Sequence, residues 1–133
     1  MPKEGIDYER RLRHFLSENG YTGVKLGRYD LLTGREGVLI RRLPGVRDDK
    51  YMDNSHQLQR LVQIIVRRRV AEEAIEDCDW LADLLDGATV ESANGTYQFV
   101  KQEVYTEPEE FVMYEDGFST WAFRLRAYLM IER

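Results

Sequence analysis

The sequence has little of the chemistry that marks a secreted, membrane-spanning or thiol-dependent protein. Among its 133 residues there is one cysteine, Cys78, so we expect neither an intramolecular disulfide nor a cysteine-based zinc site. No apolar run approaches the roughly 18 residues that a membrane helix needs, and no apolar stretch follows the first residues, so we expect no membrane span and no secretory signal. These features favour synthesis in a reducing cytoplasm.

Residues that could carry out catalysis are also scarce. The two histidines, His14 and His56, have no partner at metal-ligand spacing, and Cys78 lies on an apolar helical stripe where it should pack as a small hydrophobe. The acidic pairs at 48–49 and 109–110 match no calcium-binding loop. We therefore predict no catalytic residue, no metal site, no cofactor and no enzymatic activity.

The composition is that of a folded chain with a well-solvated surface. Hydrophobic residues make up 43%, aromatics 11% and charged residues 32%, which is enough apolar material for a core and argues against disorder. The length fits one domain, and we predict that residues 1–133 form it.

Periodicity and turn signals predict an α+β fold in which two helices pack on a mainly antiparallel, twisted β-sheet. Helices are expected at 5–19 and 71–86, a polar loop at 47–57, and strands at 24–26, 38–43, 58–70, 97–105, 111–114 and 118–131. Pro44 and Gly45 should end the strand at 38–43. The long strands 58–70 and 118–131 should form the centre of the sheet, because they are the richest in β-branched and aromatic residues.

Alternation along these two strands predicts which side chains face the helices. The expected core-facing residues are Val62, Ile64, Val66, Val70, Trp121, Phe123 and Leu125. The opposite face of strand 58–70 carries Leu61, Gln63, Ile65, Arg67 and Arg69. This second face is half apolar, which indicates that something covers it.

Charge is unevenly distributed along the chain. The net charge is −5, but residues 1–70 carry a balance of +6 and residues 71–133 a balance of −11. Acidic residues recur at helical spacing along one face of the second predicted helix: Glu72, Glu76, Asp79, Asp83 and Asp86. Like charges at this spacing destabilise a helix, so the stripe is either a solvated face or a face that docks a basic partner.

These features lead to the hypothesis that copies associate head to tail, with basic strands of one copy against acidic segments of the next. The interface candidates are Leu61, Ile65, Arg67, Arg69, Glu72, Glu76, Asp79 and Asp83. Ion pairing within one chain is the alternative, because the helix directly follows the strand. The basic clusters at 41–42 and 67–69 lie on predicted strands and alternate faces, which does not favour a sequence-specific nucleic-acid reader.

Several segments taken in order resemble the minor capsid and tail terminator proteins of long-tailed phages. They are the loop 47–55, the long strand after it, the helix opening Ala71-Glu72-Glu73-Ala74, the segment Ser92-Ala93-Asn94-Gly95-Thr96-Tyr97, the segment Val104-Tyr105-Thr106-Glu107-Pro108, and the closing Phe123-Arg124-Leu125-Arg126-Ala127-Tyr128. The resemblance covers roughly residues 47–130 together with the leading helix.

The resemblance implies a structural role in the virion. Such subunits form a ring, expected to be hexameric, at the head-proximal end of the tail tube, where they stop tube growth and join tail to head. The implied partners are further copies of the chain, the tail tube protein and a head-completion or connector protein, with DNA passing unread through the lumen. Arg124 and Arg126 are the candidates for facing the lumen or a partner. A neighbouring head-completion protein and a small nucleic-acid-binding regulator remain alternatives.

Overall fold

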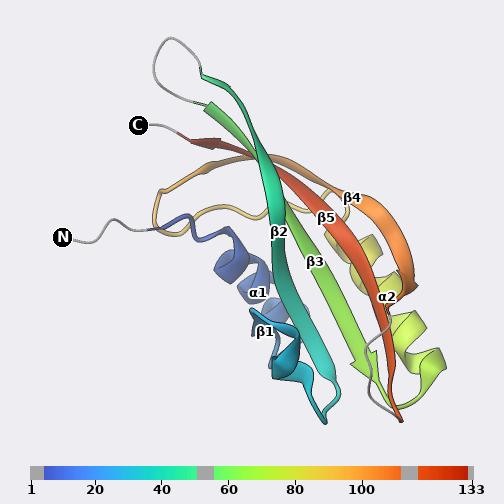
Figure 1. Ribbon diagram of the computed structural model, residues 1–133. Coiled ribbons are helices and arrows are strands. Elements are labelled where there is room, and N and C mark those ends of the chain that lie inside the picture. Colours follow the sequence, from blue (N-terminus) through green and yellow to red (C-terminus); the bar gives the residue numbers. More distant parts are fainter. Residues whose placement is uncertain (1–4, 51–55, 112–116, 132–133) are drawn as a thin grey trace.

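The computed structural model describes residues 5–50, 56–111 and 117–131, apart from the side chains of residues 29 and 48–50. Two helices lie on one face of a five-stranded sheet (Figure 1). The elements in chain order are α1 (Tyr8–Glu18), β1 (Lys25–Leu26), the 3₁₀ turn η1 (Tyr29–Leu32), β2 (Gly37–Lys50), β3 (His56–Arg68), α2 (Ala71–Leu85), β4 (Gln98–Glu110) and β5 (Ser119–Ile131). Within the described residues, neither helix has the length and apolar character required to cross a membrane.

The strand order is β1-β2-β3-β5-β4, and every pairing is antiparallel except that of the short β1 with β2. β3 and β5 pair along their whole length, from His56 opposite Ile131 to Arg68 opposite Ser119. The predicted α+β class is therefore confirmed, and so is the placement of the two long strands at the centre of the sheet.

The core lies between the sheet and the helices. Val62, Ile64 and Val66 of β3 and Phe123 and Leu125 of β5 are all buried there, as the alternation predicted. The side chains that meet them from the helices are Tyr8, Leu12, Leu16, Cys78, Leu81 and Leu85. Val70 does not join them: it is 50% exposed, because β3 ends at Arg68 and Val70 precedes the first residue of α2.

Two predicted breaks along β2 and β3 were wrong. Pro44-Gly45 does not end β2, which continues to Lys50 through a register shift between Leu43 and Val46. Gly45 makes this possible, because a Cβ there would lie 2.1 Å from the backbone oxygen of Gln59. The predicted loop 47–57 is likewise shorter, because Lys50 pairs with His56; residues 51–55 lie outside the described part.

The acidic segment after residue 105 also belongs to a strand. β4 runs through Pro108 to Glu110, with register shifts near Thr106. Proline is tolerated because β4 is an edge strand, where a missing N–H leaves no ladder bond unmade. Of the strand predicted at 111–114, residues 112–114 lie outside the described part, as do Glu115 and Asp116 of the predicted turn.

The half-apolar second face of β3 is covered by the chain itself. Ile65 is buried with Leu32 of η1, Leu39 of β2 and Ala122 of β5, and Phe111 packs against this small cluster. The Gly-punctuated stretch before β2 thus folds back over one end of the helix-free face. At this end of the sheet, the cover that the sequence predicted is therefore supplied by η1 and Phe111 of the same chain.

Candidate interaction surfaces

The three arginines at the end of β3 have different environments. Arg67 is fully buried; its Nη1 donates a 2.8 Å bond to the backbone oxygen of Leu32, and its guanidinium lies 4.4 Å from the centre of the Phe118 ring. Arg69 stacks on the same ring from 4.6 Å and is exposed. Arg68 turns to the helix side. Of these three arginines, only Arg69 therefore offers an accessible guanidinium on the helix-free face.

Arg68 makes the ion pairs that the chain forms between β3 and α2. Its guanidinium lies 2.7 Å from a Glu73 carboxylate oxygen and 2.8 Å from an Asp77 oxygen. The bond to Glu73, together with the charges of Asp77, Glu73 and Glu36, raises the pKa of Arg68 above its ordinary value despite some burial. Intramolecular pairing, the alternative left open by the sequence, thus occurs here, and it uses Glu73 and Asp77 rather than the acidic stripe.

The sequence-predicted interface residues consequently separate into two groups. Ile65 and Arg67 are buried and Leu61 is half-buried, so Ile65 and Arg67 present no accessible side chain to a second copy. The exposed members are Arg69, Glu72, Glu76, Asp79 and Asp83. The alternation of β3 identified the correct face, but it could not reveal that η1 and Phe118 cover its end.

The acidic stripe of α2 faces solvent. Among the described residues, Glu72, Glu76, Asp79 and Asp83 form no ion pair. Trp80 lies beside them, 48% exposed, with its ring centre 5.3 Å from that of Tyr21. α2 carries six acidic residues and no basic one, so this helix face combines strong negative charge with one large aromatic side chain.

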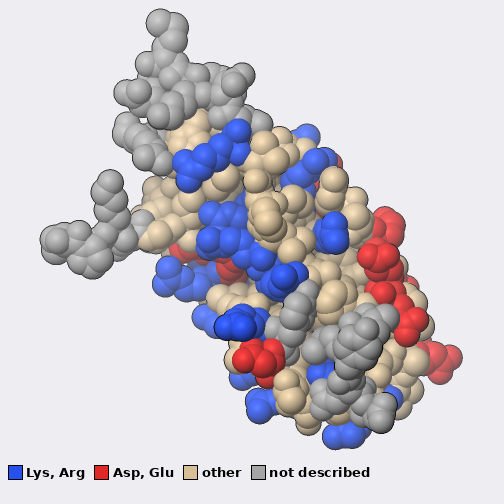
Figure 2. Space-filling view, viewed as in Figure 1, with Lys and Arg blue, Asp and Glu red and all other residues tan. Residues whose placement is uncertain are grey.

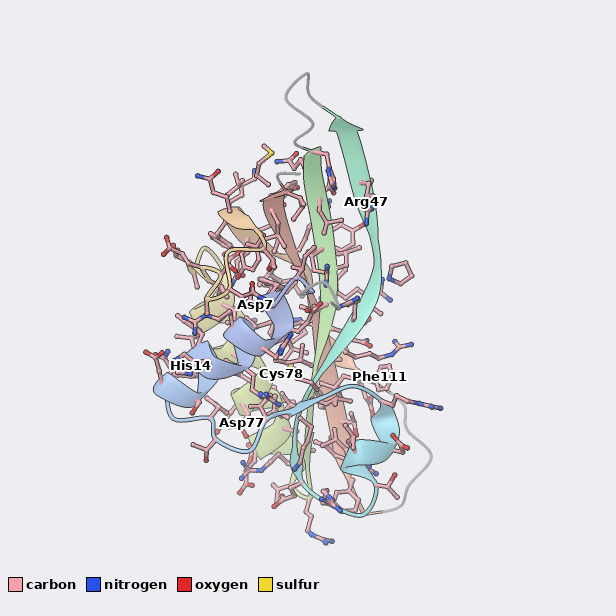
Figure 3. The ribbon with its side chains drawn as sticks, turned by 90° about the vertical axis from the view of Figure 1, so that its left-hand side faces the viewer. Asp7, His14, Arg47, Asp77, Cys78 and Phe111 are labelled. Carbon is pink, nitrogen blue, oxygen red and sulfur yellow. The ribbon has the colours of Figure 1, made fainter. Side chains whose placement is uncertain are left out.

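A basic surface follows α1, which lies on the same face of the sheet as α2 but toward the β1 edge. Arg10, Arg13 and His14 are exposed, and Figure 3, which looks at the left-hand side of Figure 1, shows α1 with His14 on this side. A groove of about 790 Å³ follows the helix. It is lined in part by Arg10, Arg11, Arg13, His14, Ser17 and Gly23. In Figure 2, Lys and Arg gather over the left and middle of the molecule, and most Asp and Glu line the right edge, where Figure 1 places β4.

Two carboxylates fix α1 in place. Asp7 accepts bonds from the Ser92 hydroxyl and from the backbone N–H groups of Ala93 and Asn94, at 2.7, 2.9 and 3.2 Å. Burial raises the pKa of Asp7, but these bonds outweigh it and hold the pKa below its ordinary value. The segment 92–96, part of the sequence resemblance, is thus the clamp for the start of α1.

Glu9 is the second carboxylate. It pairs with the buried Arg60 of β3 and, at 2.9 Å, with Arg42 of β2. Burial raises the pKa of Glu9, but the charge of Arg60 and the Arg42 bond lower it further, so the net shift is downward. α1 is therefore anchored by charge to both strands, and its exposed arginines keep a defined position.

Arg124 and Arg126, the candidates for facing the lumen or a partner, lie on the helix-free face of the sheet. They differ in how far other side chains hold them. Arg126 is held by Glu103 at 2.8 Å and lies 4.7 Å from the Tyr105 ring centre and 5.3 Å from that of Tyr128. Arg124 is exposed, and among the described residues it forms no ion pair. Arg124 is the more available of the two for a partner.

The described residues contain no group of three or more His, Cys, Asp and Glu that could hold a metal ion. His14 pairs with Glu18 one turn along α1, and His56 is buried near Arg47. Burial first, and then Asp79 and Asp77, raise the pKa of the Cys78 thiol to about 12. A thiol with so high a pKa is protonated at neutral pH, and Cys78 packs in the core with Leu81 and Leu85.

Comparison with protein families gives a match over most of the chain. A family model described as bacteriophage tail terminator protein matches residues 24–131. This stretch contains all five strands, η1 and α2, and it leaves out α1. No curated protein matches the chain.

Proposed function

Because the chain belongs to the bacteriophage tail terminator family, we propose that it assembles into a ring, expected to contain six copies, at the head-proximal end of the tail tube. In that position the ring ends tube polymerisation and presents a surface to a head-completion or connector protein. Its role is structural and its place is the virion tail. The family match is the observation that carries this proposal.

The distribution of charge supports assembly into a closed ring. A ring requires a heterologous contact, in which two different surfaces of the same chain meet. This chain has an acidic α2 and a basic groove along α1, and the two helices lie toward opposite edges of the same face of the sheet. Opposite charges on such surfaces set the register and speed encounter between copies.

The helix-free face of the sheet supplies the candidate for the lumen or for a partner. Arg124 is exposed there, and Arg126 is held between Tyr105 and Tyr128. Arginines without a pattern of base-reading side chains suit contact with the DNA backbone, which is independent of sequence. DNA then passes through the ring without sequence-specific contacts.

Two measurements test the proposal. The first is the mass of the purified chain in solution, measured by light scattering during size-exclusion chromatography and checked for rings by negative-stain electron microscopy. The second is the length of tail tubes assembled from tube protein with and without the chain. We expect a ring-sized species and tubes of limited length when the chain is present. A chain that stays monomeric at all concentrations and leaves tube growth unchanged is not a terminator ring.

A further inference from the structure

The two helices lie on the same face of the sheet but place opposite charges toward its opposite edges. α1 packs beneath β1 and β2, at one edge of the strand order, whereas α2 packs beneath β3, β5 and β4, toward the other edge. Figure 1 shows the same separation, with α1 behind the left part of the sheet and α2 behind the right part. The basic groove and the acidic stripe therefore lie toward opposite edges of the helix-covered face of one subunit. Tyr21 lines both the groove and the hollow at Trp80, so the two surfaces adjoin at this residue.

We propose that these two surfaces are the two halves of the contact between neighbouring copies, so that the acidic face of α2 in one copy seats against the basic groove along α1 in the next. The inference rests on the proposed ring and specifies its interface. It replaces the end of β3 as the basic partner, because burial of Arg67 leaves Arg69 as the single exposed member of the predicted pair. The basic half of the contact also lies outside the stretch that the family model matches.

The basic row of α1 is shorter than the acidic row of α2 and fits within its length. Glu72 to Asp83 spans about 16 Å of helix at 1.5 Å per residue, and Arg10 to Ser17 of the groove spans about 10 Å on the same basis. Three successive acidic side chains of α2 can thus lie opposite the basic residues of α1. Charged residues at this spacing fix which residues meet.

Trp80 gives the acidic surface an apolar centre. It is half-exposed between the acidic residues of α2, and Glu76 and Trp80 line the same hollow of about 350 Å³. Tryptophan and arginine are the residue types most often found at the energetic centre of interfaces, and an arginine guanidinium stacks favourably on an indole. The α1 groove supplies the arginines.

Side chains, rather than the backbone of the sheet edge, make this contact. Asp86 accepts a 2.9 Å bond from the Val104 N–H, and the Gly87 N–H donates a 3.1 Å bond to the Gln102 oxygen. The outer backbone groups in the middle of β4 are therefore occupied by the end of α2. Pro108 further along β4 also disfavours an added strand.

Charge reversal on one side at a time tests the inference. The acidic-side variant is Glu76→Lys with Asp83→Lys, and the basic-side variant is Arg10→Glu with Arg13→Glu; these four side chains are exposed and form no ion pair among the described residues. Each variant alone should need at least a tenfold higher concentration than the wild type to assemble, because like charges then meet at the substituted positions. A thermal melt by circular dichroism checks that each monomer is folded.

Mixing the variants gives the sharper readout. At the substituted positions the two variants carry charges of opposite sign, so a 1:1 mixture should form rings of normal mass in which the two alternate. If the mixture stays monomeric while both chains are folded, the inference is wrong. If either variant alone assembles like the wild type, it is also wrong.

A matched control separates this contact from general charge effects. Arg124→Glu changes the charge by the same amount as Arg13→Glu, but it lies on the helix-free face. Only Arg13→Glu should weaken assembly. If the wild type forms rings and the variants form them equally well, the proposed interface is wrong but the proposed ring is not. If the wild type neither assembles nor limits tube length, the proposed function itself is wrong.

Discussion

The phenol of Tyr8 in α1 donates a 2.8 Å hydrogen bond to the side-chain oxygen of Gln102 in β4, across 94 residues of sequence. Gln102 passes the connection on, because its Nε2 donates a 2.8 Å bond to the backbone oxygen of Leu85 at the end of α2. Burial, followed by Tyr97 and Glu9, raises the pKa of Tyr8 well above its ordinary value, so the donor stays protonated. One buried amide thus ties both helices to the edge strand.

Replacing Tyr8 by Phe should lower the free energy of unfolding by about 1–3 kcal/mol, the cost of leaving a buried acceptor unsatisfied. Urea denaturation of the monomer measures this loss. Tyr105→Phe is the control: Tyr105 is 48% exposed, and its substitution should change stability by less than about 0.5 kcal/mol. If the two substitutions lower the free energy of unfolding equally, the hydrogen bond from Tyr8 to Gln102 does not contribute to stability.

Replacing Glu9 by Gln should lower the free energy of unfolding by about 3–5 kcal/mol, because it leaves the buried Arg60 without its counter-charge. Glu9 and Arg60 side chains are only 12% and 9% exposed, so solvent does little to compensate. Denaturant unfolding at neutral pH measures the loss. The exposed Glu76→Gln should change stability by less than about 0.5 kcal/mol, and a similar small value for Glu9→Gln would contradict the role given to this pair.

Glu9 also makes stability depend on pH. Its pKa in the folded chain lies below the ordinary value of 4.5, so the folded state releases this proton more readily than the unfolded state. The stabilisation is present at neutral pH and is lost as the pH falls through 4.5 toward the folded pKa. Unfolding free energies measured between pH 7 and pH 3 should fall less steeply for Glu9→Gln than for the wild type.

Arg67→Glu and Arg69→Glu should behave differently although the two residues share the Phe118 ring. Arg67 is fully buried and bonded to the Leu32 carbonyl, so a carboxylate there is buried without a partner and should cost about 3 kcal/mol or more. Arg69 is exposed, and its reversal should cost less than about 1 kcal/mol. Thermal melts of the two variants measure this difference in stability. Similar melting temperatures would mean that Arg67 is accessible to solvent.

The β-branched and aromatic content of β3 and β5 predicted that they are the central strands. Their alternation predicted the core face, because period-two patterns report burial on one side of a sheet. What sequence reasoning missed was cover on the second face. Leu32 lies in a short 3₁₀ turn between glycines, where no periodic pattern distinguishes a buried leucine from a solvated one. The same reasoning therefore assigned Ile65 and Arg67 to an interface.

The ends of strands were misplaced for a related reason. Pro44-Gly45 and Pro108 are turn signals in general, but here each lies in a strand at or near a sheet edge, where a bulge or a missing N–H is tolerated. The acidic stripe of α2 was found because helical spacing alone defines a face. Its proposed basic partner was not, because nothing in the sequence shows that α1 and α2 lie toward opposite edges of the sheet.

Phe123→Ala should lower the free energy of unfolding by about 3–5 kcal/mol. Phe123 is 1% exposed in the core, opposite Ile64 in the strand register, so the truncation leaves a cavity between sheet and helices. Val100→Ala, at a position 49% exposed, should cost less than about 1 kcal/mol. A loss below 1 kcal/mol for Phe123→Ala, measured by chemical denaturation, would reverse the assignment of the two faces of β5.

Asp83→Asn should stabilise the monomer and weaken the ring. Asp83 lies near the end of α2, where a negative charge opposes the helix dipole at a cost of about 0.3–1 kcal/mol, and it follows Asp79 by one turn, which adds about 0.2–0.5 kcal/mol of repulsion. Neither cost is offset by an ion pair within the described residues. Removing the charge therefore raises the free energy of unfolding of the isolated chain, while it takes one charge from the surface proposed to meet α1 of the next copy.

The stability effect is best measured in the Arg10→Glu, Arg13→Glu background, where assembly does not add to it. Glu72→Gln is the matched control: it removes the same charge from the same stripe, but Glu72 lies in the first turn of α2, where a negative charge favours the dipole. It should destabilise the monomer while still weakening assembly. If the two substitutions change the free energy of unfolding in opposite directions but both weaken assembly, the stripe is a docking face. If both substitutions leave assembly of the otherwise wild-type chain unchanged, the stripe is a solvated face.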